Sequence, residues 1–305
     1  MKNEIINLLK KQNKISDEVA EEFGTIDINE FFNVVKETGT CKTNYIDRER
    51  LIANLDTEMF GENIYVYDEV MSTNTLAKFF AEQNFEEGTV IISEKQTKGR
   101  GRSGKKWESP LGGIWLSLIL RPHVDPSKAS LITLATGVAV ANTIKSFDID
   151  NVEIKWPNDI LINGKKVSGV LTEAVAKLNT IEYIVVGVGI DANLDIDTMP
   201  RDLQEDSTSL SNELNKNVDE VEVIIKFLEE FEKVFIEFSG EKYEDILKEW
   251  RRESYSIGKY VNIQEPFGNS FDGYIVGINK EGVLIVEKAD GTLQKVLSGE
   301  YTIKK

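Results

Sequence analysis

The sequence predicts a mixed α/β domain that follows a small helical segment and precedes an all-β segment. Residues 61–255 alternate short apolar strands with amphipathic helices, which is typical of α/β domains. Residues 1–60 carry helix signals only, and from residue 258 onward short strands are separated by glycine turns. We therefore expect a helical domain at 1–60, an α/β domain at 61–255 and a small antiparallel barrel at 256–305.

The N-terminal segment has the shape signals of a helix-turn-helix domain but not its charge. An apolar stripe lies at residues 5–9, Ser16 is a good N-cap, and Gly24 separates the second helix from a third at 29–37. Residues 1–60 contain eight Lys and Arg against twelve Asp and Glu, and the third helix has no Arg. Because DNA phosphates are bound by cations, this balance favours a domain that packs against the rest of the protein and disfavours DNA binding.

In the α/β domain, strands are expected where apolar runs are short and bounded by turn residues. The run at 114–120 is almost wholly apolar, which predicts a strand buried on both faces. Asn163-Gly164 has the composition of a type I′ turn, so the strands on either side should form a hairpin. The expected strands cover residues 65–67, 89–93, 114–120, 152–156, 160–162, 167–172 and 181–190.

Helices are expected where a capping residue precedes apolar periodicity. Ser72 caps a helix that contains Leu76 and Phe80. Asp125, followed by Pro126, starts a long helix rich in Ala and Leu that runs to about residue 147. Two further helices, at about 218–238 and 243–253, close the domain.

The composition excludes several classes of protein and site. The single Cys41 excludes a disulfide framework and a thiolate zinc site, and the single His123 is the only residue around which a His-based triad could form. No apolar run is long enough to span a bilayer and the N-terminus lacks the apolar core of a signal peptide, so we expect a cytoplasmic protein without a membrane partner. A net charge of −16 argues against general nucleic-acid binding.

Residues 95–106 form a glycine-rich loop with six Lys and Arg and no acidic residue. In an acidic protein such a loop attracts phosphate or carboxylate ligands, and Arg100 and Arg102 are planar donors able to wrap one. The glycine spacing also matches a dinucleotide fingerprint and nearly matches a P-loop. We reject both readings, because each requires a helix directly after the loop and the sequence continues as loop and strand.

Two further stretches carry candidate site residues. Pro157 fixes the chain within the sequence Lys-Trp-Pro-Asn-Asp at 155–159, and Lys166 follows the hairpin turn on the same expected strand face as Ser168. Gly187 and Gly189 interrupt a strand, which usually marks a bulge or a close approach to the backbone. A flat ligand laid on that strand would explain both glycines.

Together these stretches resemble the biotin–protein ligases. The family pattern of Ser-Thr-Asn, Gln-x-x-Gly-Arg-Gly-Arg, Lys-Trp-Pro-Asn-Asp, Lys-x-x-Gly and Gly-x-Gly-Ile-Asn is present at 72–74, 96–102, 155–159, 166–169 and 187–191, with Asp191 in place of the final Asn. The resemblance covers about residues 65–305, since the C-terminal segment is similar to the family's SH3-like domain. It implies a mixed-sheet catalytic domain of the biotin/lipoate ligase type between a helix-turn-helix-like domain and an SH3-like β-barrel.

The resemblance also implies an activity and a set of site residues. The activity is the ATP- and Mg²⁺-dependent activation of biotin as biotinyl-AMP, followed by transfer to a lysine of the biotin-acceptor domain of a carboxylase. Lys166 and Arg100 would be catalytic, and no protein metal ligands are implied. Substrate would be bound by Ser72, Thr73, Asn74, Gln96, Gly99, Arg100, Gly101, Arg102, Trp107, Lys166, Gly169, Gly187 and Gly189, and the nucleotide by Asn158, Asp191 and Asn193.

One departure from the family pattern and two alternatives stay open. The family usually has Asn where Asp191 stands; either Asn193 compensates or the adenine contact differs. A lipoate–protein ligase would use the same adenylation logic but would lack the Gly-Arg-Gly-Arg loop. A biotin-dependent repressor would use the N-terminal segment to bind an operator, which its acidic third helix disfavours. A homodimer is an assembly that the sequence neither requires nor excludes.

Overall fold

The computed structural model describes residues 46–177, 180–264, 270–297 and 300–303. The helix-turn-helix signals at residues 5–37 lie outside these ranges. The described end of the expected N-terminal domain contains α4 (Arg48–Asn54), which begins after the N-cap Asp47, whose carboxylate accepts a hydrogen bond from the Arg50 amide. Leu51 buries the apolar side of this helix in the main core.

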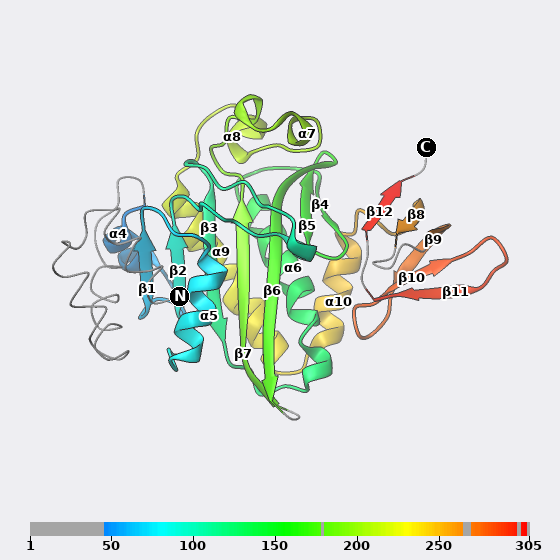
Figure 1. Cartoon of the computed structure of the whole chain (residues 1–305), viewed down its shortest axis with the longest axis horizontal. Helices are drawn as coiled ribbons and strands as arrows, with labels where there is room; N and C mark the ends of the chain where they lie inside the picture. Colours follow the sequence, from blue (N-terminus) through cyan, green and yellow to red (C-terminus); the bar gives the residue numbers. More distant parts are fainter. Residues whose placement is uncertain (1–45, 178–179, 265–269, 298–299, 304–305) are drawn as a thin grey trace.

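A seven-stranded sheet forms the centre of the α/β domain (Figure 1). The pair β1–β2 is parallel, and all other neighbouring strands are antiparallel. The order β1-β2-β3-β7-β6-β5-β4 places the long β6–β7 hairpin in the middle of the sheet. The strands are β1 (Ile64–Tyr67), β2 (Val90–Ser93), β3 (Ile114–Leu120), β4 (Val152–Lys155), β5 (Asp159–Ile162), β6 (Lys165–Lys177) and β7 (Thr180–Ile190). The expected strands are confirmed, although β6 is longer than predicted.

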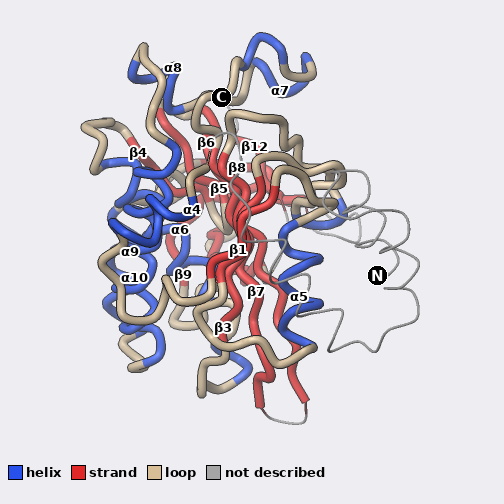
Figure 2. Tube along the Cα trace, turned by 90° about the vertical axis from the view of Figure 1, so that its left-hand side faces the viewer, coloured by secondary structure: helices blue, strands red, loops and turns tan. Residues whose placement is uncertain are grey.

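Helices cover both faces of this sheet (Figure 2). The helix α5 (Thr73–Glu82) lies on one face, and α6 (Leu131–Lys145), α9 (Glu220–Ser239) and α10 (Tyr243–Arg252) lie on the other. Strand side chains alternate between two cores. On β1, Ile64 and Val66 join the core under α6 and α9, whereas Tyr65 and Tyr67 join the core under α5. The strands are therefore buried on both faces, as their continuous apolar runs predicted.

The helix expected at 125–147 begins later than predicted. Asp125 caps a short 3₁₀ turn, η2 (Pro126–Lys128), by accepting a hydrogen bond from the Ser127 amide, and α6 begins only at Leu131. α6 is apolar around its whole circumference because it lies between the sheet and α9. Within the described ranges, no helix is both long and apolar enough to cross a membrane.

Three short helical turns between β7 and α9 were not predicted. They are η3 (Ile196–Thr198), α7 (Arg201–Gln204) and α8 (Leu210–Leu214). Elements of three to five residues are too short to show helical periodicity in a sequence. This segment becomes important below because it forms part of the cavity wall.

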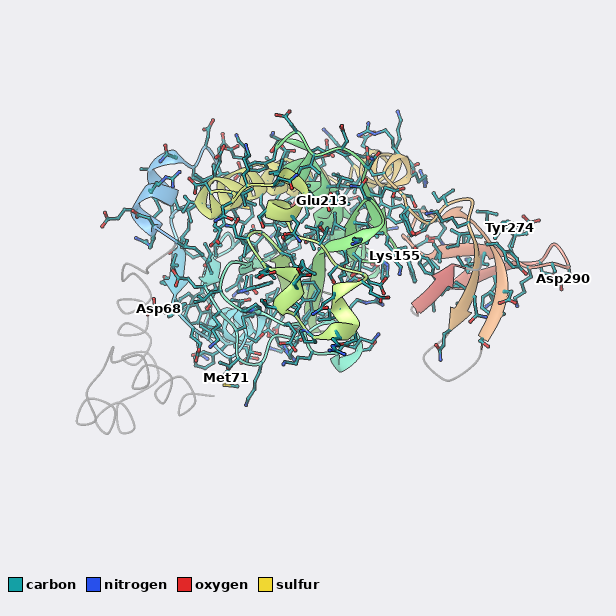
Figure 3. All side chains as sticks on the ribbon, turned by 90° about the horizontal axis from the view of Figure 1, so that it is seen from above. Asp68, Met71, Lys155, Glu213, Tyr274 and Asp290 are labelled. Atoms are coloured by element: carbon teal, nitrogen blue, oxygen red, sulfur yellow. The ribbon has the colours of Figure 1, made fainter. Side chains whose placement is uncertain are left out.

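The C-terminal segment forms an antiparallel sheet, as predicted, with the order β11-β10-β9-β8-β12. Its strands are β8 (Tyr260–Gln264), β9 (Ser270–Ile278), β10 (Leu284–Glu287), β11 (Leu293–Val296) and β12 (Glu300–Ile303). Across the described residues this order is open, with β11 and β12 at its edges. Seen from above, Tyr274 and Asp290 lie at this end of the molecule, and Asp68 and Met71 lie at the other (Figure 3). Trp156 joins the two sheets, because its indole Nε1 donates to the Gly282 carbonyl at 3.1 Å.

The aromatic face of α9 gives a test of this packing. Phe231 is fully buried, and its ring meets Phe60 edge-on at a centroid distance of 5.5 Å. Phe231→Ala should lower the free energy of unfolding by about 3–5 kcal/mol, since it deletes a buried ring and leaves a cavity. Ile236 lies on the same helix but is 57% exposed, so it is the matched control. Ile236→Ala should change the free energy of unfolding by less than about 1 kcal/mol. Chemical denaturation measures both, and equal losses would contradict the assigned orientation of α9.

Candidate functional site

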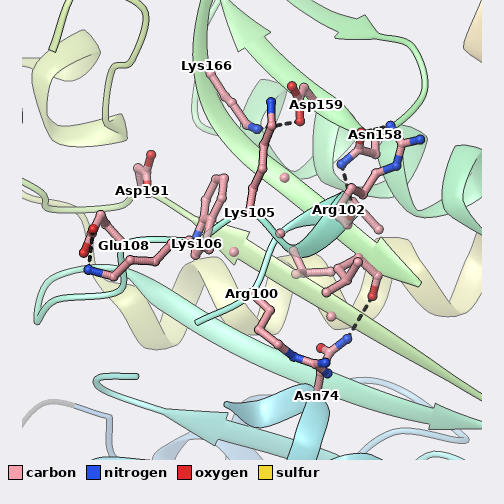
Figure 4. Close-up of a pocket in the computed structure, with 18 of the residues that line it drawn as sticks. Asn74, Arg100, Arg102, Lys105, Lys106, Glu108, Asn158, Asp159, Lys166 and Asp191 are labelled. Carbon is pink, nitrogen blue, oxygen red and sulfur yellow. Dashed lines mark hydrogen bonds and ion pairs between the residues drawn. The ribbon is translucent and has the colours of Figure 1, made fainter. Parts of the chain in front are cut away.

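A cavity of about 390 Å³ opens above the middle of the seven-stranded sheet (Figure 4). Its walls come from the basic loop, the start of α5, the strands β6 and β7, and the Trp156–Asp159 turn. Most of the predicted site residues line it, namely Ser72, Thr73, Asn74, Gln96, Arg100, Gly101, Arg102, Trp107, Asn158, Lys166, Gly169, Gly187, Gly189 and Asp191. Gly99 and Asn193 do not.

The start of α5 supplies one polar wall of the cavity. Ser72 is the N-cap, and its hydroxyl accepts from the Thr75 amide at 3.5 Å. The amide and the hydroxyl of Thr73 both donate to the Gln96 side-chain oxygen, at 2.8 and 3.2 Å. The Gln96 amide nitrogen donates in turn to Ser109 at 2.9 Å, which fixes its orientation. This wall therefore offers oriented neutral donors and acceptors and no charge.

Gly187 makes room for Asn74. A Cβ atom at position 187 would lie 1.9 Å from the Asn74 side-chain oxygen, a distance that real Cβ contacts do not reach. The same oxygen lies 2.7 Å from the Ser117 hydroxyl, and the Asn74 amide nitrogen donates to the Leu171 carbonyl at 3.1 Å. The predicted close approach to the strand is confirmed, and the group that approaches is a side chain of α5.

Trp107 lies against the other two glycines. A Cβ atom at Gly189 would be 2.7 Å from the indole nitrogen, and one at Gly169 would be 3.1 Å from the six-membered ring. The Trp107 nitrogen is buried and has no acceptor within the described part of the chain. Its ring packs edge-on against Trp115, with centroids 6.4 Å apart. The backbone at Gly169 and Gly189 therefore forms a flat surface, and the Trp107 indole covers it.

The basic loop forms a small hairpin. Arg100 and Lys106 pair across it, and the Gly101 amide donates to the Lys105 carbonyl at 2.7 Å. Gly99 is needed for the packing of this hairpin, because a Cβ atom there would lie 2.4 Å from the Trp107 carbonyl. Glycine thus has two roles in the loop, one in the turn and one at its packed base.

Two arginines of the hairpin point toward different walls of the cavity (Figure 4). The guanidinium of Arg100 pairs with Glu173 at 2.9 Å. Arg102 donates to the Asn158 side-chain oxygen at 3.2 Å, and the Asn158 amide nitrogen donates to the Val170 carbonyl at 2.9 Å. Asn158 therefore connects the basic loop to β6.

A β-bulge directs Lys166 into the cavity. The register between β5 and β6 shifts between Ile160 and Leu161, which face Ser168 and Lys166 respectively. The expectation that Lys166 and Ser168 share one strand face is wrong for this reason. Ser168 is fully buried and its hydroxyl has no partner within the described residues. Lys166 reaches the cavity instead.

The ammonium group of Lys166 lies between a carboxylate and an aromatic ring. It pairs with Asp159 at 2.6 Å and lies 4.8 Å from the centre of the Trp107 ring. The Lys166 backbone is also held by the segment before α8. Its amide donates to the Asp206 carbonyl at 2.7 Å, and its carbonyl accepts from the Thr208 amide at 2.8 Å. The contacts with Asp159, with Trp107 and with the segment before α8 thus position one cation in the cavity wall.

Asp191 and Asn193 occupy different environments. Asp191 lines the cavity with 5% of its surface exposed, and burial raises the pKa of its carboxyl to about 8, against the attraction of the Lys166 charge. Asn193 lies outside the cavity, where its side chain contacts the Val218 backbone and donates to Glu220 at 3.0 Å. Asn193 therefore holds the chain at the start of α9. Because it lies outside the cavity, it does not take the place of the family Asn that Asp191 replaces.

Sequence reasoning missed part of the wall. Met199, Leu203 and Ser207 contribute from the unpredicted short helices, and Tyr301 contributes from the C-terminal sheet. Met199 and Leu203 are four residues apart, and this spacing was the one sequence signal that could have indicated a helical turn there. The Tyr301 ring lies 5.0 Å from the Lys155 ammonium, a contact that no local pattern indicates.

Comparisons with known proteins agree with this geometry. The sequence profile of the Biotin/lipoate A/B protein ligase family matches residues 66–191, and that of the Biotin protein ligase C terminal domain matches residues 256–300. The bifunctional ligase/repressor BirA of Bacillus subtilis is 36% identical over 264 residues, which are 86% of this chain and 80% of that protein. The biotin–[acetyl-CoA-carboxylase] ligase of Mycobacterium tuberculosis is 29% identical over 212 residues, which are 68% and 76% of the two proteins.

A solved structure extends the likeness to the fold. The biotin protein ligase of Aquifex aeolicus, in complex with biotin and ATP, superposes with a TM-score of 0.68 at 28% identity and covers 80% of this chain and 99% of its own. The two domain profiles, the identity to the Bacillus relative and this superposition agree on one assignment. The chain belongs to the biotin protein ligases of the Biotin/lipoate A/B protein ligase family.

Proposed function

We propose that this chain is an ATP-dependent ligase that activates biotin as biotinyl-AMP and transfers it to a lysine of a biotin-acceptor protein. The observation that carries the proposal is the gathering of six basic side chains around one cavity, among them Lys166, Arg100 and Arg102, together with a neutral polar wall at the start of α5. A site of this kind suits a ligand with an anionic end and an uncharged polar end. Biotin has a carboxylate and a ureido ring, and its adenylate adds a phosphate.

In the first step, a carboxylate oxygen of biotin attacks the α-phosphorus of ATP and pyrophosphate leaves. Two anions must approach each other, so cations placed beforehand lower the barrier. Lys166 would stand between carboxylate and α-phosphate, and Arg100 and Arg102 would contact the phosphate oxygens. In the second step, the amine of an acceptor lysine attacks the biotinyl carbonyl and AMP leaves.

The remaining cavity residues receive binding roles in this proposal. The neutral wall of Ser72, Thr73 and Gln96 would hydrogen-bond the polar groups of biotin, and the Trp107 indole would cover its apolar part. Asn158 and Asp191 would contact the nucleotide. Asn74, Gly169, Gly187 and Gly189 shape the floor, and Gly99 and Gly101 shape the loop.

Mg²⁺ would arrive with the nucleotide. The described residues contain no group of three or more His, Cys, Asp or Glu side chains that could hold a metal ion. A magnesium ion bound mainly by phosphate oxygens and water needs only one or two protein carboxylates, so this composition fits a nucleotide-borne ion.

The direct test is ATP-dependent labelling of a biotin-acceptor domain with radiolabelled biotin, with and without Mg²⁺. Labelling that requires ATP and Mg²⁺ is expected, with biotinyl-AMP recoverable when the acceptor is omitted. Excess lipoate is the control for the alternative activity. Competition by lipoate at concentrations similar to those of biotin would point to a lipoate–protein ligase instead.

Lys166→Ala should lower the rate of adenylation on the order of a hundredfold, because it removes one preorganised cation from the reacting groups. Biotin binding, measured by calorimetry, should change much less. Lys165→Ala is the matched control, since Lys165 is the exposed neighbour on the same strand. Near wild-type adenylation by the Lys166 variant would remove this residue from the proposed mechanism.

Asp191→Asn should change how the protein responds to pH. The carboxyl of Asp191 has its pKa raised to about 8 by burial, so it keeps its proton in the folded state while the unfolded chain releases one above its ordinary pKa of 3.8. Wild-type stability should therefore fall, relative to the variant, as pH rises from about 4 to 8, by an amount on the order of a few kcal/mol. Above pH 8 the wild-type carboxylate should also weaken binding of the anionic adenylate, and the variant should not.

Melting temperature between pH 4 and 9 measures the first effect, and adenylation rate between pH 6 and 9 measures the second. Asp197→Asn, at an exposed position of η3, is the control and should leave both profiles unchanged. A stability difference between wild type and Asp191→Asn that does not vary with pH would contradict the assignment.

We infer that the N-terminal segment does not bind DNA, although relatives such as the Bacillus protein carry the name of a ligase and repressor. The inference rests on the acidic balance of residues 1–60 and on the absence of Arg from residues 29–37, where the sequence predicts the third helix. An anisotropy titration at low salt with biotin and ATP present, against fragments upstream of biotin genes, should give weak binding without sequence preference. Saturable nanomolar binding to one fragment would establish the repressor function.

A further inference from the structure

Glu173 joins three separate parts of the cavity wall. It lies on β6, where its carboxylate accepts from the Asn74 side-chain nitrogen at 3.1 Å, pairs with Lys78 of α5 at 3.0 Å, and pairs with Arg100 of the basic loop at 2.9 Å. Its side chain is 24% exposed, so the carboxylate is partly shielded from water. One group thus connects a strand, a helix and a loop that are distant in the sequence.

The contact with Asn74 continues into the floor of the cavity. Asn74 is fixed by Ser117 of β3 at 2.7 Å and by the space over Gly187. Arg100 is therefore connected through Glu173 and Asn74 to a buried strand of the sheet. An exposed ion pair contributes little order because both side chains are free to move, but here the carboxylate is already bound by two other groups.

The charge state of Glu173 supports this connection. Burial raises the pKa of its carboxyl, but the hydrogen bonds from Asn74 and Lys78 and the charge of Arg100 outweigh burial, so its pKa lies below the ordinary value. Glu173 is ionised at neutral pH and can bind a guanidinium there. Arg100 presents a planar fork of five N–H donors, so one edge can pair with Glu173 while another contacts a phosphate.

We propose that Glu173 is a positioning residue that fastens the basic loop over the cavity by binding Arg100, and so retains the adenylate until the acceptor lysine arrives. The proposal rests on the proposed function for the identity of the retained ligand. The fastening itself rests only on the contacts of Glu173. Asn74 and Lys78 orient the carboxylate, the carboxylate orients Arg100, and Arg100 meets the ligand.

Two measurements on the full chain test the proposal. The first is the fraction of biotinyl-AMP released into solution before transfer, in the presence of biotin, ATP and Mg²⁺. Glu173→Gln keeps the shape of the side chain but removes its charge, and should raise this fraction about tenfold with a smaller change in adenylation rate. Glu182→Gln, which breaks the exposed Lys177–Glu182 pair on the same hairpin, is the matched control and should not alter it.

A double-mutant cycle separates fastening from a general loss of stability. Because Glu173 acts through Arg100, adding Glu173→Gln to Arg100→Gln should release no more adenylate than Arg100→Gln alone. If the two substitutions increase the released fraction of biotinyl-AMP independently, so that their effects multiply, the proposal is overturned. It is also overturned if Glu173→Gln leaves this fraction unchanged. If Glu173→Gln folds poorly, Arg100→Lys replaces it, since an ammonium keeps the charge but cannot form the fork.

The second measurement needs no ligand. Trypsin should cut the basic loop of Glu173→Gln several times faster than that of wild type, while Glu182→Gln is cut at the wild-type rate. Equal rates in Glu173→Gln and wild type would overturn the fastening. If wild type makes no biotinyl-AMP, the proposed function fails, but this proteolysis comparison still decides whether Glu173 fastens the loop.

Discussion

The site depends on a patch of the central sheet that lacks side chains. Gly169 of β6 faces Gly189 of β7 directly in the ladder, and Gly187 faces Leu171 two residues further along. The space left by these glycines accommodates the Trp107 indole and the Asn74 amide. An alanine at 187 or 189 would collide with one of them, so the cavity and its lining groups can form together only over bare backbone.

The charges around this patch are organised before any ligand binds. Lys166 is paired with Asp159, Arg100 with Glu173, and Arg102 with the amide oxygen of Asn158. Because these partners already hold the cations in place, little reorganisation is needed when two anions bind. Avoiding that reorganisation is the main catalytic advantage of a preorganised site. The excess of acidic residues in the chain makes this gathering of cations a local feature that attracts anionic ligands.

The wider fold supports the site through large buried surfaces. α6 and α9 cover the face of the sheet opposite α5, and the strands that carry Lys166, Gly169, Gly187 and Gly189 lie at the centre of the sheet, where neighbours on both sides fix their register. The C-terminal sheet contributes directly through Tyr301, which lines the cavity beside Lys155. This contact gives the C-terminal segment a part in the site as well as in the packing.

The amino-acid sequence was enough to predict the element types and the location of the basic loop, and with the family resemblance it named fourteen of the residues that line the cavity. The element types follow from local physics: turn residues such as Asn163-Gly164, caps such as Ser72, and the conformational cost of glycine in a strand. The resemblance to a family then ordered the separate motifs into one site, which local patterns alone could not do.

Which side chains meet depends on the tertiary structure. It moved Lys166 and Ser168 onto different faces through a bulge, excluded Asn193 from the cavity, and added Tyr301 and Glu173 to the groups around it. These outcomes depend on strand register and on contacts between residues far apart in the chain. The sequence records neither directly, because a shift of one residue reverses the direction of every side chain that follows.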